Sequence, residues 1–199
     1  MNTEIEATFI GTEHNILREK LEKLGAVITK KECFIKRTIF DYEDLRLDKM
    51  AAWVRLRDEG DGITLTFKQR KSETIDGMKE IEIVVSDFEQ TKALLLAIGL
   101  VIKAEQETKR EVWELNGTEV MLDTWPWLKP ITEIEGESKE VVKELSDKLG
   151  FKWEEAVFDS TDGLYQLEFD VTRTEISTCP IKFGEIPSWL EERRREKKY

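Results

Sequence analysis

Hydrophobic and polar residues alternate with a period of two through much of the chain. The clearest case is Lys79–Val85, where Glu80 and Glu82 share one face and Ile81 and Ile83 share the other. This alternation is typical of a strand with one polar and one apolar face. The same pattern predicts strands at Thr3–Phe9, Phe34–Tyr42, Ala52–Arg57, Ile63–Arg70, Val101–Leu115, Glu119–Thr124 and Ile131–Gly136.

Short turns separate several of these segments. Glu59–Gly62, Asp76-Gly77 and Asn116-Gly117 have the composition of tight hairpin turns. Hairpins join antiparallel neighbours, so the sheet is predicted to be largely antiparallel. Trp125–Pro130 contains two prolines and is predicted to be a loop.

Three segments have the apolar spacing of amphipathic helices, and each is followed by a glycine that can end a helix. These are Glu13–Leu24 with Thr12 as its cap, Phe88–Ile98 with Asp87 as its cap, and Lys139–Leu149. A basic helix is predicted over Ile186–Lys198, opening at Pro187. No linker rich in proline, glycine or serine divides the chain, which favours one α+β domain with helices on the apolar face of the sheet.

Composition narrows the class of protein. The chain has 199 residues, 40% hydrophobic and 37% charged, so a core can form beneath a heavily charged surface. The formal net charge of −11 argues against a general binder of nucleic acid or anionic membranes. Cys33 and Cys179 are too few for a disulfide framework. No segment approaches the roughly 18 apolar residues of a membrane helix, and we expect a cytoplasmic protein.

Charge gathers on the polar faces of the predicted strands. The acids are Glu4, Glu6, Glu80, Glu82, Asp123, Glu133 and Glu135, and the bases are Arg55, Arg57, Lys68, Arg70 and Arg110. Such a face is either open to water or enclosed as the interior of a barrel. Enclosure is costly unless the charges are paired or meet a ligand. Carboxylates beside guanidinium groups suit a polyanion bound together with divalent cations.

The order of these charges resembles the CYTH superfamily of triphosphate tunnel enzymes, which includes class IV adenylate cyclases, thiamine triphosphatases and inorganic triphosphatases. That family opens with Glu-x-Glu-x-Lys, and Glu4-Ile5-Glu6 fits this motif while Thr8 stands in place of the lysine. The later family motifs are matched by Arg55-Leu56-Arg57, Lys68, Glu80-Ile81-Glu82, Lys109-Arg110, Asp123 and Glu133-Ile134-Glu135. Thr108 replaces a second basic residue of the family, and the resemblance extends to about Phe169.

The resemblance implies a closed antiparallel barrel of about eight strands whose lumen binds a triphosphate with Mg²⁺ or Mn²⁺. It assigns metal binding to Glu4, Glu6, Asp123, Glu133 and Glu135, with Glu4 and Glu6 also catalytic. It assigns the phosphates to Arg55, Arg57, Lys68 and Arg110. Arg70 is added to this set because it shares the strand face of Lys68. Glu80 and Glu82 would be supporting residues. The family domain would cover residues 1–172, followed by an extension over 173–199.

Three functions follow from this resemblance. The first is a metal-dependent hydrolase of inorganic triphosphate, thiamine triphosphate or a nucleoside triphosphate. The second is a class IV adenylate cyclase, which makes cyclic AMP and pyrophosphate. The third is a catalytically weak module that binds polyphosphate or nucleotide, suggested by Thr8 and Thr108. We expect a small-molecule triphosphate as partner, no nucleic acid or membrane, and a monomer or homodimer.

Overall fold

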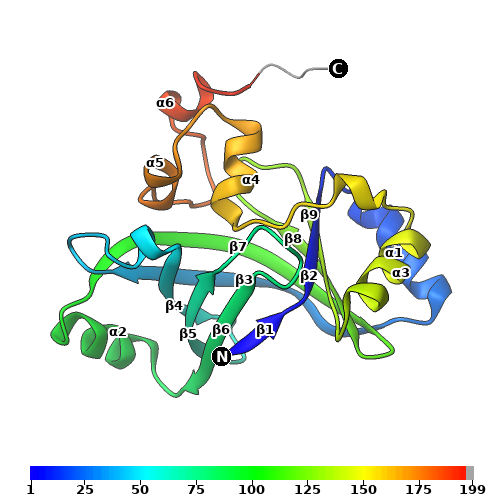
Figure 1. Ribbon diagram of the computed structural model, residues 1–199, viewed down its shortest axis with the longest axis horizontal. Helices are drawn as coiled ribbons and strands as arrows, with labels where there is room; N and C mark the ends of the chain where they lie inside the picture. Colours follow the sequence, from blue (N-terminus) through cyan, green and yellow to red (C-terminus); the bar gives the residue numbers. More distant parts are fainter. Residues whose placement is uncertain (196–199) are drawn as a thin grey trace.

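The computed structural model describes residues 1–195, and it contains one antiparallel sheet of nine strands (Figure 1). The strands are β1 (Asn2–Glu4), β2 (Glu6–Ile10), β3 (Val27–Asp41), β4 (Ala52–Asp58), β5 (Ile63–Arg70), β6 (Met78–Val85), β7 (Val101–Leu115), β8 (Thr118–Thr124) and β9 (Ile131–Glu135). Their spatial order is β1-β6-β5-β4-β3-β7-β8-β9-β2.

The two ends of this order, β1 and β2, are consecutive in the chain and separated only by Ile5. On one side of the break Glu4 lies opposite Met78 of β6, and on the other side Glu6 lies opposite Glu135 of β9. The predicted first strand is therefore split, and its two halves bring the ends of the sheet together. The expected barrel is confirmed, in nearly closed form.

β3 and β7 are the longest strands, with 15 residues each, and they pair along most of their length. Their register shifts at three places, including one between Ile39 and Phe40. Such irregularities bend a strand and increase its twist, which a sheet needs in order to curl into a barrel.

Three helices lie on the outside of the barrel: α1 (His14–Leu24), α2 (Phe88–Ala97) and α3 (Lys139–Leu149). α1 and α3 lie next to each other beside β2 and β9 (Figure 1). Leu17, Leu21 and Leu145 pack there with Phe9 and Ile134 of the strands. These contacts confirm that the apolar strand face receives helices. The cover is incomplete, because the outer face of β6 stays largely exposed.

A second set of helices lies over one side of the barrel, formed by α4 (Thr161–Glu168), α5 (Arg173–Ser177) and α6 (Ser188–Glu191) (Figure 1). We call residues 159–195 the cap. Tyr165, Phe169 and Ile176 form its core together with Trp125 of the loop after β8. The Tyr165 hydroxyl donates a 2.7 Å hydrogen bond to the carbonyl of Pro126, which ties the cap to that loop.

Two predicted features differ from the structure. Thr12 is not the cap of α1, because its side chain lies with Thr132 and Pro130, and Glu13 occupies the cap position without a side-chain bond. The terminal basic helix is shorter than predicted and ends at Glu191. Arg194 instead lies beside Phe169 and is paired with Glu168 and Glu191. Residues 196–198 of that prediction lie outside the described residues.

The helices of residues 1–195 include none long and apolar enough to cross a membrane.

Candidate functional site

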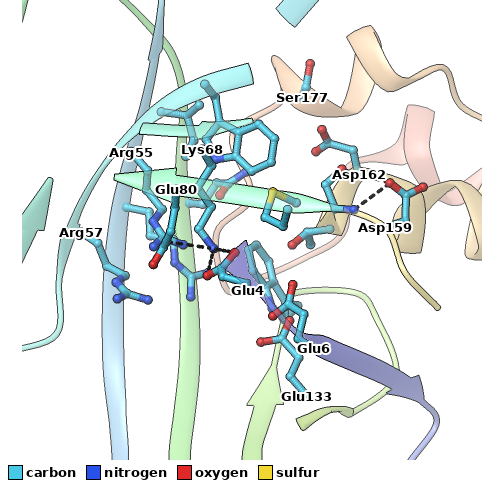
Figure 2. Close-up of a pocket in the computed structure, with 18 of the residues that line it drawn as sticks. Glu4, Glu6, Arg55, Arg57, Lys68, Glu80, Glu133, Asp159, Asp162 and Ser177 are labelled. Carbon is cyan, nitrogen blue, oxygen red and sulfur yellow. Dashed lines mark hydrogen bonds and ion pairs between the residues drawn. The ribbon is translucent and has the colours of Figure 1, made fainter. Parts of the chain in front are cut away.

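The barrel and the cap enclose a cavity of about 290 Å³. The strands contribute charged side chains to it, and the cap contributes Asp159, Asp162 and Ser177 (Figure 2). The predicted site residues that line it are Glu4, Glu6, Arg55, Arg57, Lys68, Glu80, Glu82, Arg110, Glu133 and Glu135. The polar strand faces are therefore the inside of the barrel.

One wall of the cavity is cationic and is built by β3 and β4. Arg37 of β3 lies directly opposite Arg57 of β4 in the strand register, and Arg55 is two residues along from Arg57. Like charges at directly opposed positions destabilise a sheet unless something compensates them. We call Arg37, Arg55 and Arg57 the basic wall.

The guanidinium groups of the basic wall are poorly satisfied. Within residues 1–195, Nε and Nη1 of Arg37 and Nε of Arg55 are buried without a hydrogen-bond acceptor. The Nε of Arg57 is 2.9 Å from Glu59, although its N–H is not directed at that carboxylate. Buried donors without acceptors are costly, and anion oxygens are the natural partners of guanidinium groups.

Burial and mutual repulsion also change the pKa values of Arg37 and Arg55. Burial, followed by the charge of Arg57, lowers the pKa of Arg55 to about 10. Burial, followed by the charge of Arg110, lowers the pKa of Arg37 well below its ordinary value. Both shifts arise first from removal of the guanidinium groups from water and second from repulsion by neighbouring arginines.

The facing wall is acidic and is built by β1, β2 and β9. Glu6 lies opposite Glu135 in the register, and Glu135 also lies opposite Glu119 of β8. We call Glu4, Glu6, Glu133 and Glu135 the acidic wall. Here too, residues of like charge are neighbours across the strands.

The pKa values of Glu6, Glu133 and Glu135 are raised, whereas those of Arg37 and Arg55 are lowered. Burial, followed by the charge of Glu133, raises the pKa of Glu6 to about 8. Burial, followed by the charge of Glu4, raises the pKa of Glu135 to about 7. Burial also raises the pKa of Glu133. In each case burial is the main cause, and the nearby positive charge is too small to offset burial and the neighbouring carboxylates.

Between the walls, β5 and β6 provide ion pairs. Lys68 Nζ donates hydrogen bonds of 2.6 and 2.8 Å to the two oxygens of Glu4, and it lies 3.6 Å from Glu80 (Figure 2). Glu82 accepts a 2.6 Å hydrogen bond from the Thr66 hydroxyl and lies 3.4 Å from Arg55. Glu80 and Glu82, predicted to be supporting residues, thus lie next to Lys68 and Arg55 respectively.

Arg110 connects the two walls. Its guanidinium binds both oxygens of Asp123 across β7 and β8, and it also pairs with Glu133. Asp123 is fully buried and does not line the cavity. It therefore orients Arg110, and the structure brings Asp123 close only to Glu133 among the other predicted metal ligands, with the Arg110 guanidinium bonded to both carboxylates.

Arg70 is also placed apart from the other predicted site residues. Its guanidinium pairs with Asp159 of the cap at 2.5 Å and with Glu73 at 3.2 Å, and it does not line the cavity. Asp159 is shared with Arg173 of α5. In this state Arg70 ties the barrel to the cap.

Thr8 and Thr108 are both buried and neither lines the cavity. The backbone of Thr8 exchanges hydrogen bonds of 3.2 and 2.9 Å with Val157. The segment before the cap therefore covers the position where the family motif has its lysine. Thr108 has an unpartnered hydroxyl within the described chain.

Sequence reasoning missed several cavity residues, namely Arg37, Trp53, Lys103, Asp159 and Asp162. Arg37 lies between Ile35 and Ile39 on its strand face, so the period-two pattern there looks apolar. Its guanidinium is 4.6 Å from the ring centroid of Trp125. The feature of the sequence that could have identified Arg37 as a cavity residue is that it is the one charged residue between two isoleucines of the same strand face.

The acidic wall fits a divalent cation in its chemistry. Carboxylate oxygens are the ligands that Mg²⁺ prefers, and a cation would offset the burial and the repulsion that together raise the pKa of Glu6 and Glu135. No three acidic, histidine or cysteine side chains of residues 1–195 are already gathered in a metal-binding arrangement. Glu4 is instead held by Lys68. The carboxylate oxygens of the acidic wall are suitable ligands for a divalent cation. To bind one, Glu4, Glu6, Glu133 and Glu135 would have to move closer together.

Comparison with known proteins supports the barrel fold. The family model described as the CYTH domain matches residues 2–173. No curated protein matches the chain. The division predicted at residue 172 is not tested by these findings.

Solved structures share the fold at low sequence identity. A proposed adenylate cyclase of Vibrio parahaemolyticus is 10% identical, with a TM-score of 0.73, and the match covers 83% of this chain and 98% of that one. A protein of Pyrococcus horikoshii OT3 is 19% identical, with a TM-score of 0.69, over 81% and 98% of the two chains. A proposed adenylyl cyclase of Hippeastrum, whose structural description reports a dominant triphosphatase activity, is 15% identical, with a TM-score of 0.54, over 79% and 91%.

Proposed function

Because this chain belongs to the CYTH family, we propose that it hydrolyses triphosphate-containing substrates with the help of a divalent cation. The substrate would be inorganic triphosphate, thiamine triphosphate or a nucleoside triphosphate. The observation that carries this proposal is the opposition of two incompletely compensated charge sets in one cavity. Arg37 of the basic wall and Glu6 and Glu135 of the acidic wall pair with no opposite charge of residues 1–195, and a metal–polyphosphate complex would supply both acceptors and a cation.

The basic wall would bind the phosphate chain. Arg37, Arg55 and Arg57 present donors into one cavity, and planar guanidinium groups bind two phosphate oxygens at once. Charge that develops on the transferred phosphoryl group would be stabilised by donors already in place, which is where most of the catalysis of phosphoryl transfer arises.

The acidic wall would hold the cation and orient the attacking water. Glu4, Glu6, Glu133 and Glu135 are the residues that would hold Mg²⁺ or Mn²⁺, which supplies charge neutralisation on the phosphate oxygens. Glu6 is not paired with any base of residues 1–195, and its pKa of about 8 leaves it mostly protonated at neutral pH in the metal-free chain. The charge of a bound cation would favour its ionised form, which could then accept a proton from water. Lys68 fixes the orientation of Glu4 beside it.

The direct test is to incubate the protein with tripolyphosphate, thiamine triphosphate and ATP, each with Mg²⁺ or Mn²⁺, and to identify the products. Release of orthophosphate that stops when the cation is chelated is the expected result. Cyclic AMP with pyrophosphate would instead identify a cyclase. Binding of these anions without any product would identify the binding module and overturn the hydrolase.

Variants of the acidic wall connect the reaction to this cavity. Glu4→Gln and Glu135→Gln each remove a carboxylate charge while keeping the side-chain shape, and we expect both to abolish metal-dependent turnover. Glu140→Gln on the exposed face of α3 is the matched control. Unchanged rates in both cavity variants, with the fold intact by circular dichroism, would refute the proposal.

A further inference from the structure

Arg37 is a buried cation whose neighbours across the strands offer it no negative charge. It is 4% exposed, and it lies opposite Arg57 of β4 on one side and Gln106 of β7 on the other. The nearby acid Asp123 is already bound by Arg110. Within residues 1–195 Arg37 belongs to no ion pair, so the position of its side chain depends on another kind of contact.

The contact that Arg37 does make is with the face of Trp125. The central carbon of its guanidinium lies 4.6 Å from the centroid of the indole ring. An indole face attracts a cation, and the attraction is stronger where water is excluded. Trp125 is only 6% exposed and lines the same cavity.

This kind of contact leaves the hydrogen-bond donors of the arginine unused. The N–H groups of a guanidinium lie in its plane, whereas an aromatic ring stacks against its flat face. In agreement with this, Nε and Nη1 of Arg37 are buried without acceptors within the described chain. An acid in the place of Trp125 would occupy these donors and neutralise the charge. The indole therefore stabilises the cation and keeps it available to an anion.

Trp125 is itself fixed by the cap. Its side chain packs in the core of the cap with Tyr165, Phe169 and Ile176. The next residue, Pro126, accepts the 2.7 Å hydrogen bond from the Tyr165 hydroxyl. Because closely packed side chains have little freedom to move, an indole held in this core also restrains the guanidinium that lies against it.

We propose that Trp125 is a positioning residue for polyphosphate binding, which holds the Arg37 guanidinium against its indole face so that the free N–H groups of Arg37 meet phosphate oxygens. The inference rests on the proposed function for the location of the phosphates. It goes further by giving the loop after β8 a role that acts through Arg37 and needs no contact between Trp125 and the phosphates. The position of one side chain of the basic wall thus depends on the packing of the cap.

The test is a double-mutant cycle on binding. Dissociation constants for tripolyphosphate with Mg²⁺ are measured by calorimetry for the wild type, Trp125→Leu, Trp125→Phe, Arg37→Met and the double variant Arg37→Met with Trp125→Leu. Trp189→Leu is the matched control, because Trp189 is a tryptophan of the cap that has Arg193 5.7 Å from its ring centroid and does not line the cavity. Melting temperatures show that each variant is folded. If Trp125→Leu unfolds, Trp125→Met replaces it in the cycle, since methionine adapts to irregular space.

We expect Trp125→Leu to weaken binding about three- to tenfold, because an arginine that is no longer held must be ordered when the anion binds. Trp125→Phe keeps an aromatic face and should recover most of this loss. In the Arg37→Met background, Trp125→Leu should cause no further loss. Trp189→Leu should leave the dissociation constant unchanged.

Two results would overturn the inference. One is an unchanged affinity in Trp125→Leu. The other is a loss that is as large in the Arg37→Met background as in the wild type, because Trp125 would then act through the fold and not through Arg37. Turnover is not part of this readout. Coupling between the two residues in a chain that binds tripolyphosphate but releases no orthophosphate would support the inference while refuting the hydrolase.

Discussion

The two walls of the cavity are built by the same kind of structure and carry opposite charge. On β3 and β4 the inward side chains are arginines with too few acceptors, whereas on β1, β2 and β9 they are glutamates with too few cations. Each wall places residues of like charge opposite one another in the strand register, as with Arg37 and Arg57 or Glu6 and Glu135.

No ion pair of residues 1–195 joins the basic wall to the acidic wall directly. Lys68 and Arg110, which lie outside the basic wall, pair instead with Glu4 and Glu133 of the acidic wall. The comparison teaches that opposite charges in one cavity can remain uncompensated when the backbone holds them apart. Such a cavity is prepared for a ligand that carries both signs.

The largest expected effect comes from breaking the basic wall. Arg55→Gln removes a buried guanidinium that lacks an acceptor at Nε. We expect kcat/KM for tripolyphosphate to fall about 100- to 1,000-fold, the usual cost of losing one donor that stabilises transition-state charge. Arg46→Gln on the surface is the control. A loss smaller than about threefold would show that this wall does not hold the reacting phosphates.

The acidic wall should make stability depend on pH. The pKa of Glu6 is about 8 and that of Glu135 about 7 in the folded chain, against an ordinary value of 4.5. Between these values the folded state holds more protons than the unfolded chain, so the free energy of unfolding falls as pH rises. We expect the metal-free protein to melt about 5–10 °C higher at pH 5 than at pH 8.

Two comparisons sharpen that result. Glu6→Gln removes one of the titrating groups and should flatten the pH dependence, and saturating Mg²⁺ should flatten it for the wild type. Calorimetric melts in buffers of equal ionic strength measure both. A melting temperature that increases with pH over this range would contradict the assignment of uncompensated acids to this wall.

A smaller effect should come from removing Arg37. Arg37→Met keeps the length of the side chain and its packing beside Trp125, but it removes buried donors and a charge that neighbouring arginines repel. We expect the free protein to gain about 1–2 kcal/mol of stability while its affinity for tripolyphosphate decreases. Chemical denaturation and calorimetry measure the two quantities. A destabilised variant would show that Arg37 is a structural residue.

The smallest effect is expected outside the cavity. Lys143 and Asp147 form a 2.8 Å pair on the exposed face of α3. Asp147→Asn should change stability by less than about 0.5 kcal/mol, because water and salt screen exposed pairs. A change in stability as large as that for Arg37→Met would contradict the idea that buried charges of the cavity affect stability more than exposed charges do.

Much of the barrel follows from local patterns. β5 and β7 have the predicted bounds because strong alternation ends at turn residues, and α3 has them because its apolar stripe lies between Ser138 and Gly150. α4 was not predicted, since it is short and contains Gly163. Tertiary packing of Tyr165 and Leu164 stabilises it.

The gathering of charge on inward faces could also be predicted, but the choice of partners could not. Arg70 shares a strand face with Lys68, yet it pairs with Asp159, which is 89 residues away in the chain. Asp123 lies on β8, as predicted, but its carboxylate accepts hydrogen bonds from Arg110 and does not line the cavity. Local alternation gives the face of a residue, whereas its partner depends on which distant segment packs beside it.

The split first strand has a consequence for the order in which the molecule forms. Residues 2–10 are synthesised before both of their pairing partners, Met78–Glu80 and Ile131–Glu135. Pairing over such sequence distances is slow, because the intervening chain must first be ordered. Glu4 and Glu6 lie on this segment, so the acidic wall cannot assemble before β9 has left the ribosome. The acidic wall is therefore completed only after β9 is made, whereas β1 and the basic wall can pair with β3 to β6 before then.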